Sequence, residues 1–169
     1  MKTVVFIVAP EVFRDEEYYK PKKILQDAGI SVITASLKIG EITGRFGYKA
    51  ISDILVSDIK EKDFGAIVYV GGGGAKVYFD NADTLRLAND FYNAGKITSA
   101  ICIAPVILAN SGILKGKKAT VFPDGIEALE KCGAIYTANP VETDKNIITA
   151  NHADASELFG NKLLTAFNK

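Results

Sequence analysis

Cys102 stands between two apolar runs and is the residue of this chain best placed to act as a nucleophile. The run before it, Ile97–Ile101, is short and partly β-branched, as a buried parallel strand is. Pro105 opens the run after it, and proline fits the first turn of a helix. We therefore predict Cys102 on a tight strand-to-helix turn, where free backbone N–H groups and the helix dipole favour a reactive, low-pKa thiolate. A buried structural cysteine is the alternative.

Two further side chains could take part in cysteine chemistry. Glu17 falls near the start of a predicted helix, and if it faces inward it could lie beside Cys102. A protonated carboxyl there would donate a hydrogen bond to the thiolate, and an ionised one could act as a base. His152 is the only histidine, so any Cys–His dyad within one subunit must use it. The alternative for both residues is an exposed side chain.

Four glycines, Gly71–Gly74, follow a predicted strand over residues 66–70. Glycines in this place let backbone N–H groups approach a reacting oxygen closely and form one side of an oxyanion hole. A plain flexible turn is the alternative. No G-x-G-x-x-G motif passes through the run, and residues 112–118 fall one residue short of a P-loop. We therefore expect no nucleotide cofactor, and one histidine with two separated cysteines predicts no metal site.

Length and composition point to a single domain spanning residues 1–169. The 20 basic and 20 acidic residues balance, and no basic stripe suggests a nucleic-acid partner. No apolar run approaches membrane-spanning length, and Glu11 interrupts the apolar start of the chain, which we interpret as a first strand rather than a signal peptide. Two cysteines make no disulfide framework, so we expect reduced thiols in a cytoplasmic protein.

The elements that must position these residues alternate along the chain. Predicted strands cover residues 3–8, 30–36, 66–70, 97–101 and 119–122, with edge strands at 135–137 and 147–150 joined by a polar link. Predicted helices cover residues 15–28, 81–94, 125–132 and 154–167, and residues 40–48 form a small hairpin arm. Pro21 implies a kink or a late start in the first helix. This alternation indicates an α/β fold with a mainly parallel sheet and helices on both faces.

Ligands of open α/β sheets bind beyond the carboxyl ends of the strands. Four features are predicted at that edge: Glu17 after the first strand, the Gly71–Gly74 turn, the Cys102 turn and the loop at His152. Their convergence indicates a functional site there.

Several motifs together resemble the ThiJ/PfpI family, which is class I glutamine amidotransferase-like. The superfamily includes the parkinsonism-linked protein deglycase and archaeal intracellular peptidases. The motifs are residues 13–17 with Pro21, residues 42–48, residues 70–72, residues 100–105 and residues 112–118. The resemblance covers nearly the whole chain and implies a flavodoxin-like three-layer α/β sandwich that forms a homodimer or a higher homo-oligomer.

The resemblance also implies roles for individual residues. It makes Cys102 the nucleophile on the strand-to-helix turn and Glu17 its carboxyl partner. The implied oxyanion and substrate-binding residues are Gly72, Gly73, Ile103 and Arg45. Arg45 would reach a neighbouring subunit's site if the protein dimerises through the hairpin arm. No cofactor is implied.

Three functions follow from this resemblance. The first is glyoxalase- or deglycase-like action on a small-molecule carbonyl through Cys102 and Glu17. The second is oxidative-stress sensing or a chaperone-like role, in which Cys102 is oxidised without turnover. The third is a peptidase or amidase using His152 or a partner subunit. It is disfavoured because Ile103 stands where peptidase members carry histidine and Lys76 stands where their acidic partner aligns.

Overall fold

A seven-stranded sheet forms the centre of the computed structural model, which describes residues 3–168. The strand order is β11-β12-β8-β7-β1-β3-β6. Parallel pairing joins β1 (Thr3–Ile7), β3 (Ser31–Ser36), β6 (Ile54–Leu55), β7 (Ala66–Tyr69), β8 (Ile97–Ile101) and β12 (Ile147–Ala150), and the edge strand β11 (Val141–Asp144) is antiparallel to β12. The order β3-β1-β7-β8-β12 is the flavodoxin-like one, with its switch point beside β1.

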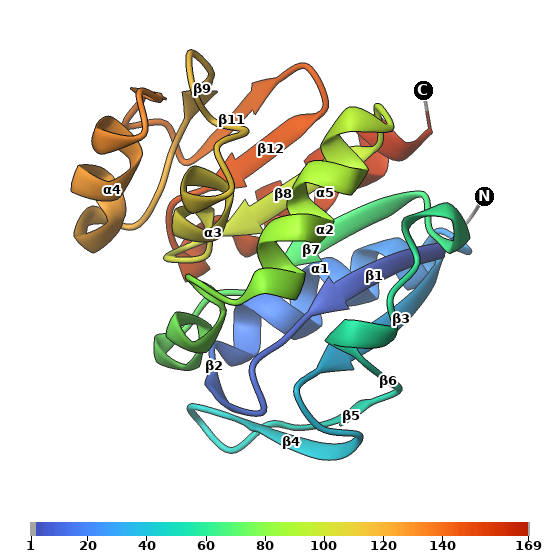
Figure 1. Ribbon diagram of the computed structural model, residues 1–169. Helices are drawn as coiled ribbons and strands as arrows, with labels where there is room; N and C mark the ends of the chain where they lie inside the picture. The colour runs from blue at the N-terminus through green and yellow to red at the C-terminus, as the bar shows by residue number, and fades with distance from the viewer. Residues whose placement is uncertain (1–2, 169) are drawn as a thin grey trace.

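Helices cover both faces of this sheet (Figure 1). Helices α1 (Asp15–Asp27) and α5 (Ser156–Phe167) pack together on one face. Helices α2 (Ala82–Asn93) and α3 (Pro105–Asn110) cover the other face, and α4 (Ile126–Lys131) packs beside α3. A side chain on Gly160 would come within 3.0 Å of the Pro21 Cα atom, so this glycine lets α5 approach α1 closely. The predicted three-layer α/β fold is confirmed.

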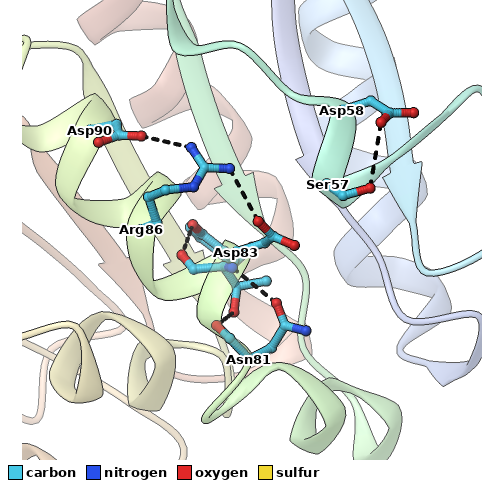
Figure 2. A network of polar contacts seen from close by, with 8 residues as sticks. Ser57, Asp58, Asn81, Asp83, Arg86 and Asp90 are labelled. Atoms are coloured by element: carbon cyan, nitrogen blue, oxygen red, sulfur yellow. Dashed lines mark hydrogen bonds and ion pairs between the residues drawn. The ribbon is translucent and has the colours of Figure 1, made fainter.

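Burial explains why the inner strands read as continuous apolar runs. Every residue of β7 and β12 is buried, as is expected where helices cover both faces of a parallel strand. At the N-terminus of helix α2, a side chain satisfies one of the backbone N–H groups that have no partner within the helix. The Asn81 side chain caps the helix by accepting the Thr84 backbone N–H at 3.1 Å (Figure 2). On its exposed side Arg86 pairs with Asp83 and Asp90 (Figure 2).

Within residues 3–168, two small sheets and five short 3₁₀ helices complete the fold. The predicted hairpin arm is confirmed as β4 (Gly40–Gly44) and β5 (Lys49–Ser52), and β2 (Glu11–Phe13) joins it. The other small sheet pairs β9 (Lys118–Ala119) with β10 (Ile135–Tyr136). The 3₁₀ helices are η1 (Val56–Asp58), η2 (Glu61–Asp63), η3 (Gly73–Tyr78), η4 (Pro123–Gly125) and η5 (Ala153–Ala155).

Three sequence-based predictions about the strands are wrong. Residues 147–150 form an inner strand rather than an edge, because the polar link before them pairs as β11. The strand predicted at 119–122 ends at Ala119, since the Thr120 N–H bonds the Thr149 hydroxyl at 2.9 Å instead of continuing a ladder. Residues 135–136 pair with β9 and not with the central sheet. Pro21 does not delay α1, which runs from Asp15 through the proline to Asp27.

No helix within residues 3–168 is both long enough and apolar enough to cross a membrane. Over the same residues, no three histidine, cysteine or acidic side chains gather as a metal ion would require.

Candidate active site

A cavity of about 590 Å³ opens at the carboxyl ends of β1, β7 and β8. Its size falls within the range of small-molecule sites. The lining residues are Arg14, Glu17, Arg45, Gly72, Gly73, Lys76, Phe79, Cys102, Ile103, Val106, Asn110, Phe122, Asp124, Ala128 and His152. All the residues singled out from the sequence as catalytic, oxyanion-binding or substrate-binding therefore line one cavity.

Cys102 occupies the turn between β8 and α3 in a left-handed backbone conformation, with φ at 63°. Such a φ is strained for a residue with a side chain and costs about 1–2 kcal/mol. Two backbone hydrogen bonds hold the turn: the Cys102 N–H donates to the Ala150 carbonyl at 2.8 Å, and the Phe122 N–H donates to the Cys102 carbonyl at 2.8 Å. The thiol is half-buried and forms no disulfide.

Glu17 is fully buried in the first turn of α1. Gly71 separates it from the nucleophile: a side chain there would lie 2.5 Å from Glu17 Oε2 and 2.8 Å from Cys102 Cβ. Neither oxygen of the Glu17 carboxyl makes a hydrogen bond of full geometry to any residue from 3 to 168. The thiol of Cys102 and the N–H of Gly71 are nevertheless close enough to lower its pKa. Glycine at position 71 thus lets the carboxyl approach the sulfur.

Burial dominates the protonation of this pair. It raises the pKa of Glu17 from its usual 4.5 to about 7, although Cys102, Arg14 and Gly71 oppose the shift. Burial, and then the neighbouring carboxylate, raise the pKa of the Cys102 thiol above its usual range. The low thiol pKa predicted from the sequence is therefore wrong, because desolvation and Glu17 outweigh the backbone N–H groups. Near neutral pH, Glu17 is poised to accept a proton from a thiol.

Two backbone N–H groups are directed at the sulfur. Those of Gly72 and Ile103 both act to lower the pKa of the Cys102 thiol, as donors to developing negative charge do. Gly72 has φ at 96°, a conformation that favours glycine, and it packs against the backbone of residues 12–14. When the sulfur adds to a carbonyl carbon, these N–H groups could donate hydrogen bonds to the carbonyl oxygen as it becomes negatively charged. Their oxyanion role, like that of Gly73 in substrate binding, stays a prediction.

His152 lines the cavity, but it is oriented by other groups. Its ring stacks on Phe122 at 5.7 Å between centroids, and its Nδ1 accepts the Asp154 N–H at 3.2 Å. Among the described residues it makes no hydrogen bond to Cys102. A catalytic role for His152 stays a prediction.

Sequence reasoning missed several cavity residues. Arg14 precedes α1 and pairs with Glu16 at 2.8 Å. Lys76 lies in η3, so the glycine run continues into a short helix that brings a cation to the cavity. Arg14 could have been suspected from its position three residues before Glu17, whereas no local pattern marks the apolar lining residues Phe79, Val106, Phe122 and Ala128.

A cysteine on a strand-to-helix turn, beside a buried glutamate and at the carboxyl edge of an α/β sandwich, has the strand–turn–helix geometry in which hydrolases present a nucleophile. Comparison with known proteins then identifies the family. The model of the DJ-1/PfpI family matches residues 2–166, and the chain belongs to that family.

Named relatives and solved structures span nearly the same length. The chain is 44% identical to "Uncharacterized protein MJ0967" of Methanocaldococcus jannaschii, over 98% of this chain and 82% of that protein. It is 30% identical to "Deglycase PfpI" of Pyrococcus furiosus, over 88% and 89%. The crystal structure of a ThiJ/PfpI domain protein from Brachyspira murdochii matches with a TM-score of 0.97 and 30% identity, covering 99% of this chain and 97% of that one.

Proposed function

We propose that this protein converts small 1,2-dicarbonyl compounds into 2-hydroxy acids, with Cys102 as nucleophile and Glu17 as general base. The observation that carries the proposal is the fully buried Glu17 carboxyl next to the Cys102 thiol, with a pKa of about 7, inside a cavity of ligand size. The Pyrococcus furiosus relative named "Deglycase PfpI" supports carbonyl chemistry in this family.

The first step follows from the protonation of the pair. Ionised Glu17 takes the thiol proton as the sulfur adds to the aldehyde carbon of an α-oxoaldehyde such as methylglyoxal. The charge that develops on the former aldehyde oxygen lies near the N–H groups of Gly72 and Ile103. Protonated Glu17 then returns its proton to this oxygen, which completes a neutral hemithioacetal and leaves Glu17 ionised for the next step. A base with a pKa near the working pH suits this transfer, and no preformed thiolate is required.

The second step is an internal redox exchange. Glu17 removes the former aldehyde proton from carbon to give an enediol and delivers it to the adjacent carbonyl carbon, while the hydroxyl proton moves from the first oxygen to the second. The aldehyde carbon is thereby oxidised and the ketone carbon reduced. The product is a thioester of a 2-hydroxy acid on Cys102. Water then cleaves the C–S bond, releases the acid and returns the thiol. Atoms and electrons balance with water as the only co-reactant.

The pH dependence of kcat/KM for methylglyoxal tests this proposal. Activity should rise with pH through about 7 as Glu17 ionises. Glu17→Gln should lower kcat/KM by about 10²–10⁴-fold, the usual contribution of a general base. The same variant should accelerate alkylation of Cys102 by iodoacetamide above neutral pH, because the repelling carboxylate is gone.

Glu157→Gln, which removes an exposed carboxylate of α5 outside the cavity, is the matched control for the charge change. A Glu17→Gln variant that keeps full methylglyoxal turnover would show that the carboxyl is not the base. Absence of 2-hydroxy acid from the wild-type reaction at every pH would overturn the proposal as a whole.

The other two functions expected from the sequence receive less support. A raised pKa of the Cys102 thiol slows oxidation by peroxide, which attacks the thiolate. The peptidase expected from the sequence would use His152 as its base, and the Nδ1 of His152 accepts the Asp154 N–H rather than a proton from Cys102. Selective peroxide oxidation of Cys102 without carbonyl turnover would favour the sensor. Amine release from peptides or amides would favour the peptidase.

A further inference from the structure

The cavity carries more positive than negative charge apart from the reacting pair. Three cationic side chains line it, Arg14, Arg45 and Lys76, against one further carboxylate, Asp124. A cavity with an excess of one sign concentrates ligands of the other. Of the three cations, Arg14 lowers the pKa of Glu17, whereas the proposed proton transfers assign no step to Arg45 or Lys76.

The three cations differ in whether they are neutralised. Arg14 is paired with the Glu16 carboxylate at 2.8 Å. For Arg45 and Lys76, no carboxylate within the described residues 3–168 comes as close as an ion pair requires. Two exposed cations at the cavity rim therefore keep their charge available to a ligand.

Arg45 is held in place by the backbone of its arm. The buried Asp15 carboxylate accepts the N–H groups of Phe46 at 3.0 Å and Tyr48 at 2.8 Å. The Arg45 N–H itself donates to the Phe13 carbonyl at 2.8 Å. The turn that carries Arg45 is thus tied to the start of α1, the helix that carries Glu17.

Lys76 reaches the cavity from the other side of the glycine run. It belongs to η3, which starts at Gly73, directly after the oxyanion candidate Gly72. The same cavity is also lined by apolar side chains such as Phe79 and Val106. The arrangement suits a molecule with a carbonyl at one end, a short carbon chain and a negative group at the other.

We propose that the substrate is an α-oxoaldehyde bearing a carboxylate or a phosphate, with Arg45 and Lys76 binding the anionic end. This proposal rests on the proposed function and names its substrate class. The chemistry is unchanged: the thiol adds to the aldehyde carbon, the oxidation and reduction stay within the substrate, and water releases a 2-hydroxy acid that keeps the second anionic group.

Alkylation of Cys102 tests the charge preference without requiring turnover. Iodoacetate and iodoacetamide are of similar size and differ in charge, so their rate ratio on Cys102, divided by the ratio on N-acetylcysteinamide, measures anion selection. In a Cys132→Ser background, we expect this quotient to be about 10 in favour of iodoacetate, the preference that two exposed ion pairs would give. Lys76→Gln and Arg45→Gln should each reduce it about threefold.

Lys162→Gln on α5 removes the same charge outside the cavity and should leave the quotient unchanged. Added salt should lower the quotient in the wild type, since rim charges are screened. A quotient near one, or one that Lys76→Gln and Arg45→Gln do not move, would overturn the proposal.

Turnover then identifies the anionic group. With 4,5-dioxopentanoate and its methyl ester, which share the reacting carbons, we expect a lower KM for the free acid by about tenfold. In 3-phosphooxy-2-oxopropanal a phosphate takes the place of the carboxylate. The compound with the lower KM shows whether the cavity prefers a carboxylate or a phosphate. Equal turnover of acid and ester would overturn this inference and leave the proposed function intact. Anion-selective alkylation without turnover of any dicarbonyl would overturn the proposed function and leave only the binding of an anionic group by Arg45 and Lys76.

Discussion

Both cysteines lie at turns that end a secondary-structure element, but the residue with a left-handed backbone conformation differs between the two turns. At the end of α4, Cys132 has an ordinary φ of −80° and its thiol donates to the Leu129 carbonyl at 3.0 Å. The left-handed position falls on the next residue, Gly133, where it costs little. At the end of β8 the left-handed position falls on Cys102 itself. The strain is kept where a side chain is needed to reach into the cavity.

The two cysteines also differ in which segments of the chain form hydrogen bonds with them. The Cys102 turn is pinned by hydrogen bonds from two distant segments, through Ala150 and Phe122, which oppose its strain. Cys132 is satisfied within its own helix and lies outside the cavity. The comparison teaches that position in the fold, rather than exposure of the thiol, separates a reactive candidate from an incidental cysteine, since both thiols are half-buried.

The largest expected effect is on turnover. Cys102→Ser should reduce dicarbonyl turnover by at least about 10³-fold, because a serine hydroxyl is a far weaker nucleophile than a cysteine thiol. Cys132→Ser should remain within about twofold of the wild type, since it changes one atom away from the cavity. Hydroxy-acid production measured for both variants checks this pair, and equal losses would break the contrast.

A second difference is the pH dependence of stability around each cysteine. Glu17 has a pKa of about 7 when folded and 4.5 when exposed, so its contribution is complete below pH 4.5 and is lost as the pH rises to about 7. Relative to Glu17→Gln, the wild type should lose about 3 kcal/mol of unfolding free energy over this interval.

Urea unfolding at a series of pH values measures this loss. Glu130→Gln, which changes an exposed carboxylate two residues before Cys132, should show no comparable dependence. Parallel pH curves for the wild type and Glu17→Gln would contradict an uncharged, buried Glu17.

The smallest expected effect is the backbone preference at each turn. At position 102 glycine should be more stable than alanine by about 1 kcal/mol, because only alanine keeps the strained φ. At position 132 the order should reverse, with alanine more stable by about 0.5–1 kcal/mol. Unfolding free energies of the four variants test this reversal, and the same order at both positions would rule out strain at Cys102.

The alternation of the central elements could be predicted because its signals are local. The runs ending at Gly71 and Cys102 are apolar and short, and the helices end at glycines such as Gly29 and Gly95. The same logic placed Glu17, Cys102 and the glycine run at one edge, because parallel strands bring their carboxyl ends together.

The sequence did not reveal which strand pairs where at the far edge of the sheet. Residues 141–144 are polar and half-exposed, so nothing local distinguishes β11 from a loop until β12 is there to pair with it. The prediction of a low pKa for the Cys102 thiol was wrong for a related reason. The pKa of this thiol depends on how deeply Glu17 and Cys102 are buried together. That burial is set by long-range packing, which the helix-start argument does not contain.

The strand order has a consequence for synthesis on the ribosome. Glu17 follows β1 and Cys102 follows β8, with β7 between them in the sheet, so the proposed base and nucleophile can meet only after most of the chain has emerged. The juxtaposition on which the proposed function depends is therefore a property of the assembled sheet, and no segment shorter than residues 17–102 contains both side chains.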